Sequence, residues 1–215
     1  MINQSNSLRR KTLCVLSTVL FLTMFLLMGS VQAQSPNSSI RLRASIEKID
    51  GGTMTLKERN GEILNIAIDP SVSISECLPI DIEAIKPGSF IGSGALPQLD
   101  GTLKAVEVLV FPESMRGAGE GHRAWDVLPQ STMTNATVSE VIASSQSKGR
   151  TLQLRYKDGE KTLVIPSDAP IVTFIPGDRA LLVIGAKLIV TVQEKEGKFT
   201  ATRIIAGRNG FQPPM

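Results

Sequence analysis

The chain has few of the residues on which most catalytic and metal sites depend. Its 215 residues contain two Cys, one His, one Trp and one Tyr. A single His rules out a multi-histidine zinc site, and no pair of Cys has zinc-ligand spacing. No Gly-x-Ser-x-Gly elbow is present, so a serine hydrolase is disfavoured as well. The sequence therefore favours a protein that is not an enzyme, although it leaves that question open.

The first 33 residues have the three-part pattern of a secretory signal. A polar start ends in Arg9-Arg10-Lys11, Thr12 to Met28 are almost entirely apolar, and Val31 and Ala33 are small residues before a cut. We expect cleavage near Ala33–Gln34 and export to the periplasm or the extracellular space. The alternative is an uncleaved anchor, because the apolar stretch is close to the shortest length that spans a membrane.

An excess of positive charge is missing from the remaining residues 34–215. Removing Arg9, Arg10 and Lys11 from the 23 basic side chains leaves 20, which equals the 20 acidic ones. Binding to a phosphate backbone needs clustered positive charge, and base stacking needs several aromatic side chains. We predict no nucleic-acid partner, and membrane contact only through the signal segment if it is uncleaved.

Disulfide bonds within the mature chain are excluded. Cys14 leaves with the signal, so Cys77 remains alone. The sequence favours Cys77 as a small buried hydrophobic residue, since no Lys, Arg or His is close in sequence to lower its pKa. A disulfide between two chains is the alternative.

The mature chain repeats itself with a period near 97 residues. Four pairs of landmarks stay in register at offsets of 98, 98, 97 and 96: Leu56 with Leu154, Gly61 with Gly159, Gly88 with Gly185, and Ala105 with Ala201. This period is too long for a solenoid repeat, and it indicates two related small domains.

Each copy has the pattern of a small β-barrel. Asn60-Gly61, Asp100-Gly101 and Asp158-Gly159 are hairpin signals between runs of strand-forming residues. In the first copy Asp81 can cap a short helix that Pro87-Gly88 ends. The second copy lacks this Lys-Pro, so we expect its helix to be lost or altered.

Three strands, a short helix and two strands are the element order of an OB-like barrel. We therefore predict a mainly β protein of two tandem five-stranded OB-like barrels related by internal duplication. The predicted segments are a signal peptide (1–33), a polar linker (34–39), a first barrel (40–111), a Gly-rich connector (112–133), a second barrel (134–207) and a tail (208–215).

The connector holds the single His and the single Trp, with three Gly in five positions. It can be a structural link in which Trp125 packs between the barrels, or a binding site. The binding hypothesis assigns the ligand contacts to Arg116, Glu120, His122, Arg123, Trp125 and Asp126. A third hypothesis uses Glu113, Glu120 and His122 as metal ligands or as acid and base, although the spacing is not that of a known metal motif.

The chain resembles a family of exported bacterial proteins built from OB-like β-barrel domains of unknown function. The resemblance covers nearly all of the mature chain and is most specific in Ile85–Gly92, Asp100–Ala105, Phe111–Glu113, Gly119–His122, Trp125-Asp126 and Ser131–Val138. It implies the barrel fold and export, but no activity and no catalytic residue.

These observations predict a non-enzymatic periplasmic or cell-envelope binding or scaffolding module, with an envelope protein or a small ligand as its partner. No cofactor is expected, although a metal is possible. The alternative is a metal- or small-ligand-binding protein, or an enzyme, that uses the Glu, His and Asp residues of the connector.

Overall fold

The computed structural model describes residues 39–143, 149–195 and 197–214, and the mainly β fold class is confirmed. The strands are β1 (Ser39–Asp50), β2 (Thr53–Glu58), β3 (Ile63–Pro79), β4 (Phe90–Pro97), β5 (Leu103–Val110), β6 (Gly121–Ala124), β7 (Thr132–Ala143), β8 (Arg150–Tyr156), β9 (Gly159–Ile165), β10 (Ile171–Pro176), β11 (Lys187–Lys195) and β12 (Lys198–Gly207). Three one-turn 3-10 helices accompany them: η1 (Ile82–Ala84), η2 (Glu113–Met115) and η3 (Arg179–Leu181). The signal peptide (1–33), its cleavage site and most of the linker (34–39) lie outside the described residues.

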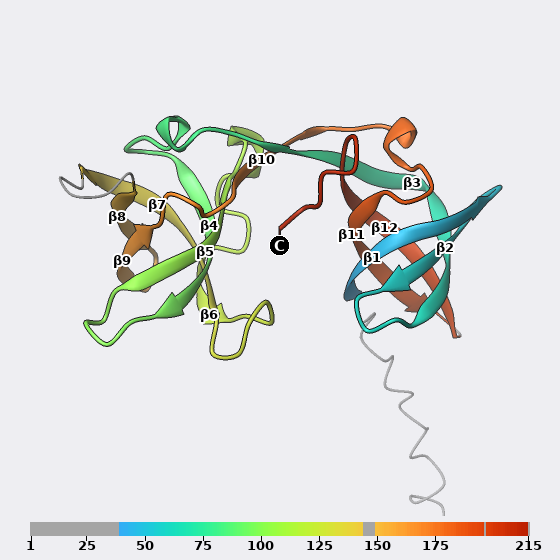
Figure 1. Cartoon of the computed structure of the whole chain (residues 1–215), viewed down its shortest axis with the longest axis horizontal. Coiled ribbons are helices and arrows are strands. Elements are labelled where there is room, and N and C mark those ends of the chain that lie inside the picture. The colour runs from blue at the N-terminus through green and yellow to red at the C-terminus, as the bar shows by residue number, and fades with distance from the viewer. Residues whose placement is uncertain (1–38, 144–148, 196, 215) are drawn as a thin grey trace, which may run out of the picture. The chain divides into compact units, whose positions relative to one another are not determined.

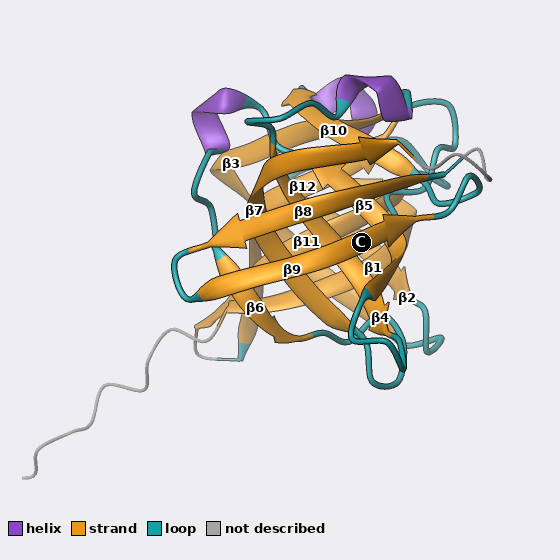
Figure 2. Cartoon of the chain, turned by 90° about the vertical axis from the view of Figure 1, so that its left-hand side faces the viewer, coloured by secondary structure: helices purple, strands orange, loops and turns teal. Residues whose placement is uncertain are grey.

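The strands pair into two closed rings of five (Figure 1). Ring A has the order β12-β11-β1-β2-β3 and is closed by parallel pairing of β3 with β12. Ring B has the order β5-β4-β7-β8-β9 and is closed by parallel pairing of β5 with β9. Figure 2 looks onto ring B, where β7, β8 and β9 lie side by side.

Each ring combines strands from both of the segments that were expected to form separate barrels. Ring A combines β1, β2 and β3 with β11 and β12, and ring B combines β4 and β5 with β7, β8 and β9. The expected arrangement, in which residues 40–111 and 134–207 each close a barrel of their own, is therefore not the one observed. The order of elements along each segment is as expected, but the last two strands of each segment are exchanged.

The exchange takes place where β3 meets β10. The second half of β3 pairs antiparallel with β10, which places Cys77 opposite Phe174, and β10 also pairs parallel with β5. Cys77 is 1% exposed and forms no disulfide, and burial raises the pKa of its thiol to about 12. The expectation of a buried Cys77 is confirmed.

Three apolar clusters fill this framework. One lies inside ring A around Leu56 and Ile204, and a second lies inside ring B around Leu152 and Leu163. The third lies at the junction of the two rings, where outward-facing residues of both rings meet Cys77 and Phe174. Burying the outer faces at the junction adds a core that neither ring has alone.

The predicted hairpins are confirmed, and Gly61, Gly101 and Gly159 have positive φ angles at their turns. The expected helix after Asp81 is present, but the Asp81 side chain makes no capping hydrogen bond. The second copy keeps its helical turn, contrary to expectation. There the Asp178 side chain accepts the Ala180 N–H, and Gly185 has a positive φ like that of Gly88 in the first segment, although the Lys-Pro before it is missing.

Within the described ranges, the helices are too short and too polar to cross a lipid bilayer.

The exchange of strands predicts how fragments behave. If the chain is divided after Gly117, each fragment holds only three strands of one ring and two of the other. We expect neither fragment to be a folded monomer, because two- and three-stranded open sheets leave their cores exposed. An equimolar mixture should regain the β-sheet circular dichroism of the whole chain as a one-to-one complex in analytical ultracentrifugation. A folded monomer of either fragment alone would contradict the exchange.

Candidate functional site

The connector folds back onto ring B through a short added strand. β6 pairs with β7, with His122 opposite Thr134, and this strand was not expected from the sequence. The Asn135 amide donates to the Ala118 carbonyl at 2.9 Å, and Arg123 donates to the Gly119 carbonyl at 2.9 Å. Gly119 has a φ of +59°, which a side chain adopts only with strain. These bonds hold the loop before β6 against the sheet.

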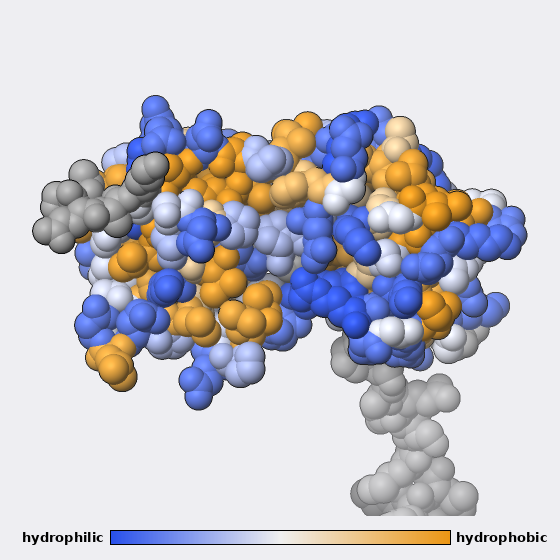
Figure 3. Space-filling view, viewed as in Figure 1, coloured by the Kyte–Doolittle hydropathy of each residue, from blue (hydrophilic) through white to orange (hydrophobic). Residues whose placement is uncertain are grey.

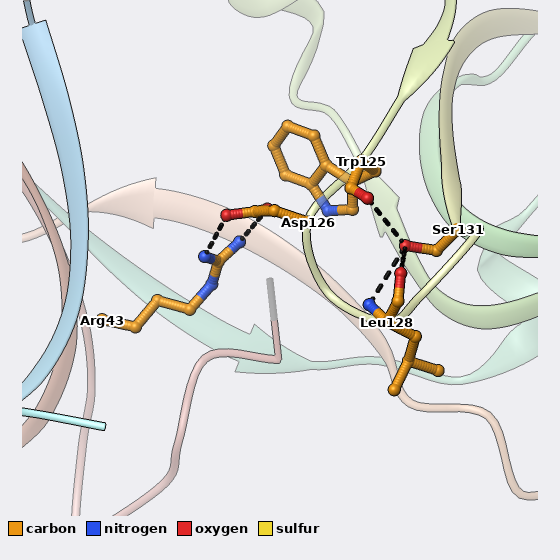
Figure 4. A network of polar contacts seen from close by, with 5 residues as sticks. All are labelled: Arg43, Trp125, Asp126, Leu128 and Ser131. Atoms are coloured by element: carbon orange, nitrogen blue, oxygen red, sulfur yellow. Dashed lines mark hydrogen bonds and ion pairs between the residues drawn. The ribbon is translucent and has the colours of Figure 1, made fainter. Parts of the chain in front are cut away.

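A tight turn after β6 positions Trp125 and Asp126. The Ser131 hydroxyl accepts the Leu128 N–H at 3.1 Å and lies 3.0 Å from the Trp125 carbonyl oxygen (Figure 4). The backbone N–H of Trp125 donates to the Ser131 carbonyl, and Gln130 has a positive φ within the turn. The turn therefore presents the two side chains toward ring A.

Three guanidinium groups surround the Trp125 ring. Arg41 and Arg43 come from β1 of ring A, and Arg123 comes from β6. Their central carbon atoms lie 5.2, 5.9 and 5.7 Å from the ring centroid. These distances are those of cation–π contacts, which are worth about 0.5–1 kcal/mol each at exposed sites. Trp125 therefore joins the two rings through charged residues as well as through packing.

Asp126 forms a two-pronged ion pair with Arg43 across the same junction. The two hydrogen bonds are 2.9 and 3.0 Å long (Figure 4). The hydrogen bonds from Arg43 hold the pKa of Asp126 below its usual range. The Arg43 side chain is 14% exposed and that of Asp126 is 67% exposed, so the carboxylate remains open to solvent on its outer side.

A buried carboxyl group lies beneath these residues. Glu107 on the outer face of β5 is 2% exposed, and its side chain lies over Gly94, where a Cβ atom would come within 2.9 Å of Oε1. Gly92, two residues earlier on β4, leaves the corresponding space for Asn135. Burial raises the pKa of Glu107 to about 7, although Arg43, Arg41 and Arg59 oppose this shift.

Four buried polar atoms in this region have no hydrogen-bond partner among the described residues. They are Arg43 Nε, Glu107 Oε1, Trp125 Nε1 and Asn135 Oδ1, and they are all such atoms in the described ranges. We call the group that holds them the connector cluster; it consists of Arg41, Arg43, Glu107, Arg123, Trp125, Asp126 and Asn135. A buried polar atom without a partner costs roughly 1–3 kcal/mol, so the connector cluster carries a concentrated cost in hydrogen bonds that are not made.

The structure gathers only some of the residues predicted for the site. Arg123, Trp125 and Asp126 lie in the connector cluster, as the binding hypothesis expects. Arg116 forms an ion pair with Glu113 and also donates to the Gly88 carbonyl at 3.0 Å. It lies outside the cluster.

The other predicted residues contact parts of the chain outside the connector cluster. Glu120 accepts the Lys157 N–H at 3.1 Å. His122 Nδ1 lies 2.8 Å from the Thr134 hydroxyl, and its ring stacks on Tyr156. Burial and nearby Lys161 lower the pKa of His122. In the described part of the chain, no three His, Cys, Asp or Glu side chains come together as a metal site, so Glu113, Glu120 and His122 are not brought together.

Sequence reasoning missed Arg41, Arg43 and Glu107. In Ile40–Ala44, arginine alternates with apolar residues, a pattern typical of a strand with one face in water. The acid in the apolar run Ala105–Val110 was the one available signal for Glu107. The face seen in Figure 3 carries strongly hydrophilic residues near its middle, with hydrophobic residues to either side.

No match was found when the chain was compared with protein-family models, with curated proteins and with solved structures.

The contacts of Trp125 predict its contribution to stability. We expect Trp125→Ala to lower the free energy of unfolding by about 2 kcal/mol, because a half-buried indole and three cation–π contacts are lost. Trp125→Phe keeps an aromatic face and should lose less than half of that. Urea denaturation followed by circular dichroism measures both variants. Unchanged stability of Trp125→Ala would show that the ring does not hold the junction together.

The buried Glu107 predicts a dependence of stability on pH. Its pKa is about 7 in the folded chain against an ordinary 4.5, so folding favours the protonated form. The contribution of this carboxyl group to the free energy of unfolding is therefore fully present below about pH 4.5. It is lost as the pH rises through about 7, because the folded chain then has to hold the charged form. The charged groups around it are Arg41, Arg43, Arg59 and Asp126.

Glu107→Gln cannot ionise, so the difference in stability between this variant and the natural chain should grow in favour of the variant from pH 5 to pH 8. The growth should be at most about 3 kcal/mol. Urea denaturation at four pH values measures it, with Glu62→Gln at an exposed position as the control. A difference that stays constant over this range would mean that Glu107 does not titrate there.

Proposed function

We propose that residues 34–215 form an exported, non-enzymatic binding or scaffolding module made of two duplicated OB-like halves that have exchanged strands. Corresponding positions support the duplication. Ile204 on β12 pairs with Ile74 on β3, and Val108 on β5 pairs with Ile171 on β10 at the equivalent positions of the other half. A β-bulge also interrupts β1 after Ile46 and β7 after Val138. A helical turn follows β3 in the first copy and β10 in the second, in each case before the last two strands, and this adds to the OB-like pattern.

The observation that carries the binding role is the set of four unpartnered buried polar atoms in the connector cluster. Glu107 Oε1 and Asn135 Oδ1 are acceptors, while Trp125 Nε1 and Arg43 Nε are donors. A partner with hydroxyl or amide groups can both donate to the first pair and accept from the second. Such groups are present on small polar ligands and on the side chains of an envelope protein.

Catalysis finds less support in the same geometry. A general base must lie within hydrogen-bond reach of the proton that it takes from a reacting group. The His122 ring instead contacts the Thr134 hydroxyl and the Tyr156 ring. Glu107 has a raised pKa, and the charged groups that act on it are three arginines and an aspartate. The nearby Cys77 thiol is buried, and its pKa is raised to about 12, so it is not available as a thiolate. The cluster is therefore better suited to recognition than to bond making.

Mass spectrometry of the chain purified from the envelope fraction of an expression host tests this function. The denatured mass should match Gln34–Met215, and the native mass should exceed it by a bound partner. Trp125→Phe, which removes only one donor from the cluster, should retain less of the extra mass. Tyr156→Phe removes one polar atom from an aromatic ring outside the cluster and should retain all of it. A bare monomer at its native mass would overturn the binding role.

A further inference from the structure

A pocket of about 290 Å³ opens on ring A, next to the connector cluster but mostly lined by other residues. Four segments that are far apart in the sequence form its walls: β1, the end of β2 with Arg59, the start of β11 and the C-terminal tail. The residues that matter for its chemistry are Arg43, Ser45, Lys57, Arg59, Lys187 and Pro213. This volume is at the small end of the range for ligand pockets.

The strand register places the cations on one face. Ser45 on β1 is directly opposite Lys57 on β2 and directly opposite Lys187 on β11. Residues opposite each other point to the same side of a sheet, and neighbouring strands are about 4.8 Å apart. The Arg59 N–H donates to the Arg43 carbonyl at 3.3 Å, which adds a second pair of cations beside the first row.

These cations outnumber the acids that line the same pocket. The described residues offer no ion-pair partner to Lys57, Arg59 or Lys187, and Asp126 occupies the end of the Arg43 guanidinium. Glu47 accepts from the Ser45 hydroxyl at 3.3 Å, and Glu58 accepts from the Asn60 amide at 3.1 Å. Like charges brought together on one face repel, and a bound anion relieves this repulsion.

The corresponding row of ring B is different. There Thr137 is opposite Arg155 on one side and Phe90 on the other, so one cation is replaced by an aromatic ring. The remaining cation, Arg155, forms a 3.0 Å ion pair with Glu160. The concentration of unpaired cations is therefore specific to ring A and is not a consequence of the fold.

The C-terminal tail supplies the apolar wall. Arg208 donates two hydrogen bonds to the buried carboxylate of Glu76, at 2.9 and 2.7 Å, and the Phe211 N–H donates to the Arg208 carbonyl at 3.0 Å. These contacts fix the chain that leads to Pro213, which is buried against the pocket. The pocket thus has a positively charged side and an apolar side.

We propose that this pocket binds a small molecule that carries a phosphate group. Lys57, Arg59 and Lys187 hold the phosphate oxygens, since Lys provides mobile point charges and Arg a fork that matches phosphate geometry. The Ser45 hydroxyl lies between the two lysines, and the side next to Pro213 receives the organic part of the molecule. This site is additional to the connector cluster and involves different side chains, apart from Arg43.

Calorimetric titration and thermal melting of the mature chain with pyrophosphate and with glycerol 3-phosphate test the proposal. Sodium chloride at equal ionic strength serves as the reference, because salt alone screens the lysines. We expect saturable binding and a melting temperature raised by about 3 °C when the ligand concentration is about ten times Kd.

The double variant Lys57→Gln, Lys187→Gln should bind at least about tenfold more weakly, because two charge-assisted contacts are lost. Without ligand it should melt above the natural chain, since the repulsion is gone; this second measurement shows that the variant folds. The matched control is Lys104→Gln, Lys157→Gln, two exposed lysines of the part of the chain that forms ring B. The control should bind as the natural chain does.

Vesicles identify the source of the phosphate. Lysine-dependent binding of glycerol 3-phosphate supports a free phosphate ester, and lysine-dependent sedimentation with phosphatidylglycerol vesicles, but not with phosphatidylcholine vesicles, supports a lipid headgroup. Effects that are equal in the double variant and the control, or no effect beyond that of sodium chloride, would overturn the proposal. Trp125→Phe should leave phosphate binding unchanged, so failure of the connector cluster and failure of this pocket are told apart.

Discussion

The antiparallel pairing of β3 with β10 is the constraint on which the rest of the structure depends. β3 runs without interruption from ring A into the junction, so the chain that follows it reaches ring B and supplies β4 and β5 there. β10 leads the chain back to ring A in the same way. The buried pair of Cys77 and Phe174 lies at the centre of this crossing, where a polar side chain would be left without a partner.

The crossing also explains why charged residues are buried at the junction. Ring A and ring B turn outer faces toward each other, and in a separate barrel such faces would be in water. Arg43 and Glu107 lie on these faces, on β1 and β5 respectively. Asp126 offsets the desolvation cost of Arg43. For Glu107 the nearby arginines offset this cost only in part, and its pKa rises as a result. The connector cluster is thus a product of the exchange.

Local patterns predicted the elements but not their partners. The strands, the hairpin turns at Gly61, Gly101 and Gly159, and the turn after Asp81 follow from spacing and turn chemistry within a few residues. The two segments predicted as copies have similar sequence patterns, so β4 with β5 and β11 with β12 fit either ring by pattern alone. The choice between them depends on the pairing of the second half of β3 with β10, which is a long-range property. A self-contained barrel was the natural expectation for that reason.

The site was predicted in part for a related reason. Trp125 and Asp126 stand out because the chain has one Trp and an unusual glycine-rich connector around it. Arg41 and Arg43 look like solvent-facing residues, because alternation shows which face of a strand is polar but not what that face meets. The helical turn of the second copy was underestimated since Asp178 caps it through a side chain, without the Lys-Pro pattern of the first copy.

Because the cluster draws on both rings, the binding that we propose there would be coupled to the closure of the whole fold. Arg43 comes from the first strand, Glu107 from β5 and Trp125 from the connector, so they meet only when the exchange is complete. A ligand that satisfies the unpartnered atoms would stabilise the folded chain alone, since the unfolded chain has no such site. Without a ligand, the unpartnered atoms lower the free energy of unfolding of the protein. On the proposed binding role, the junction is the place where a ligand would most affect stability.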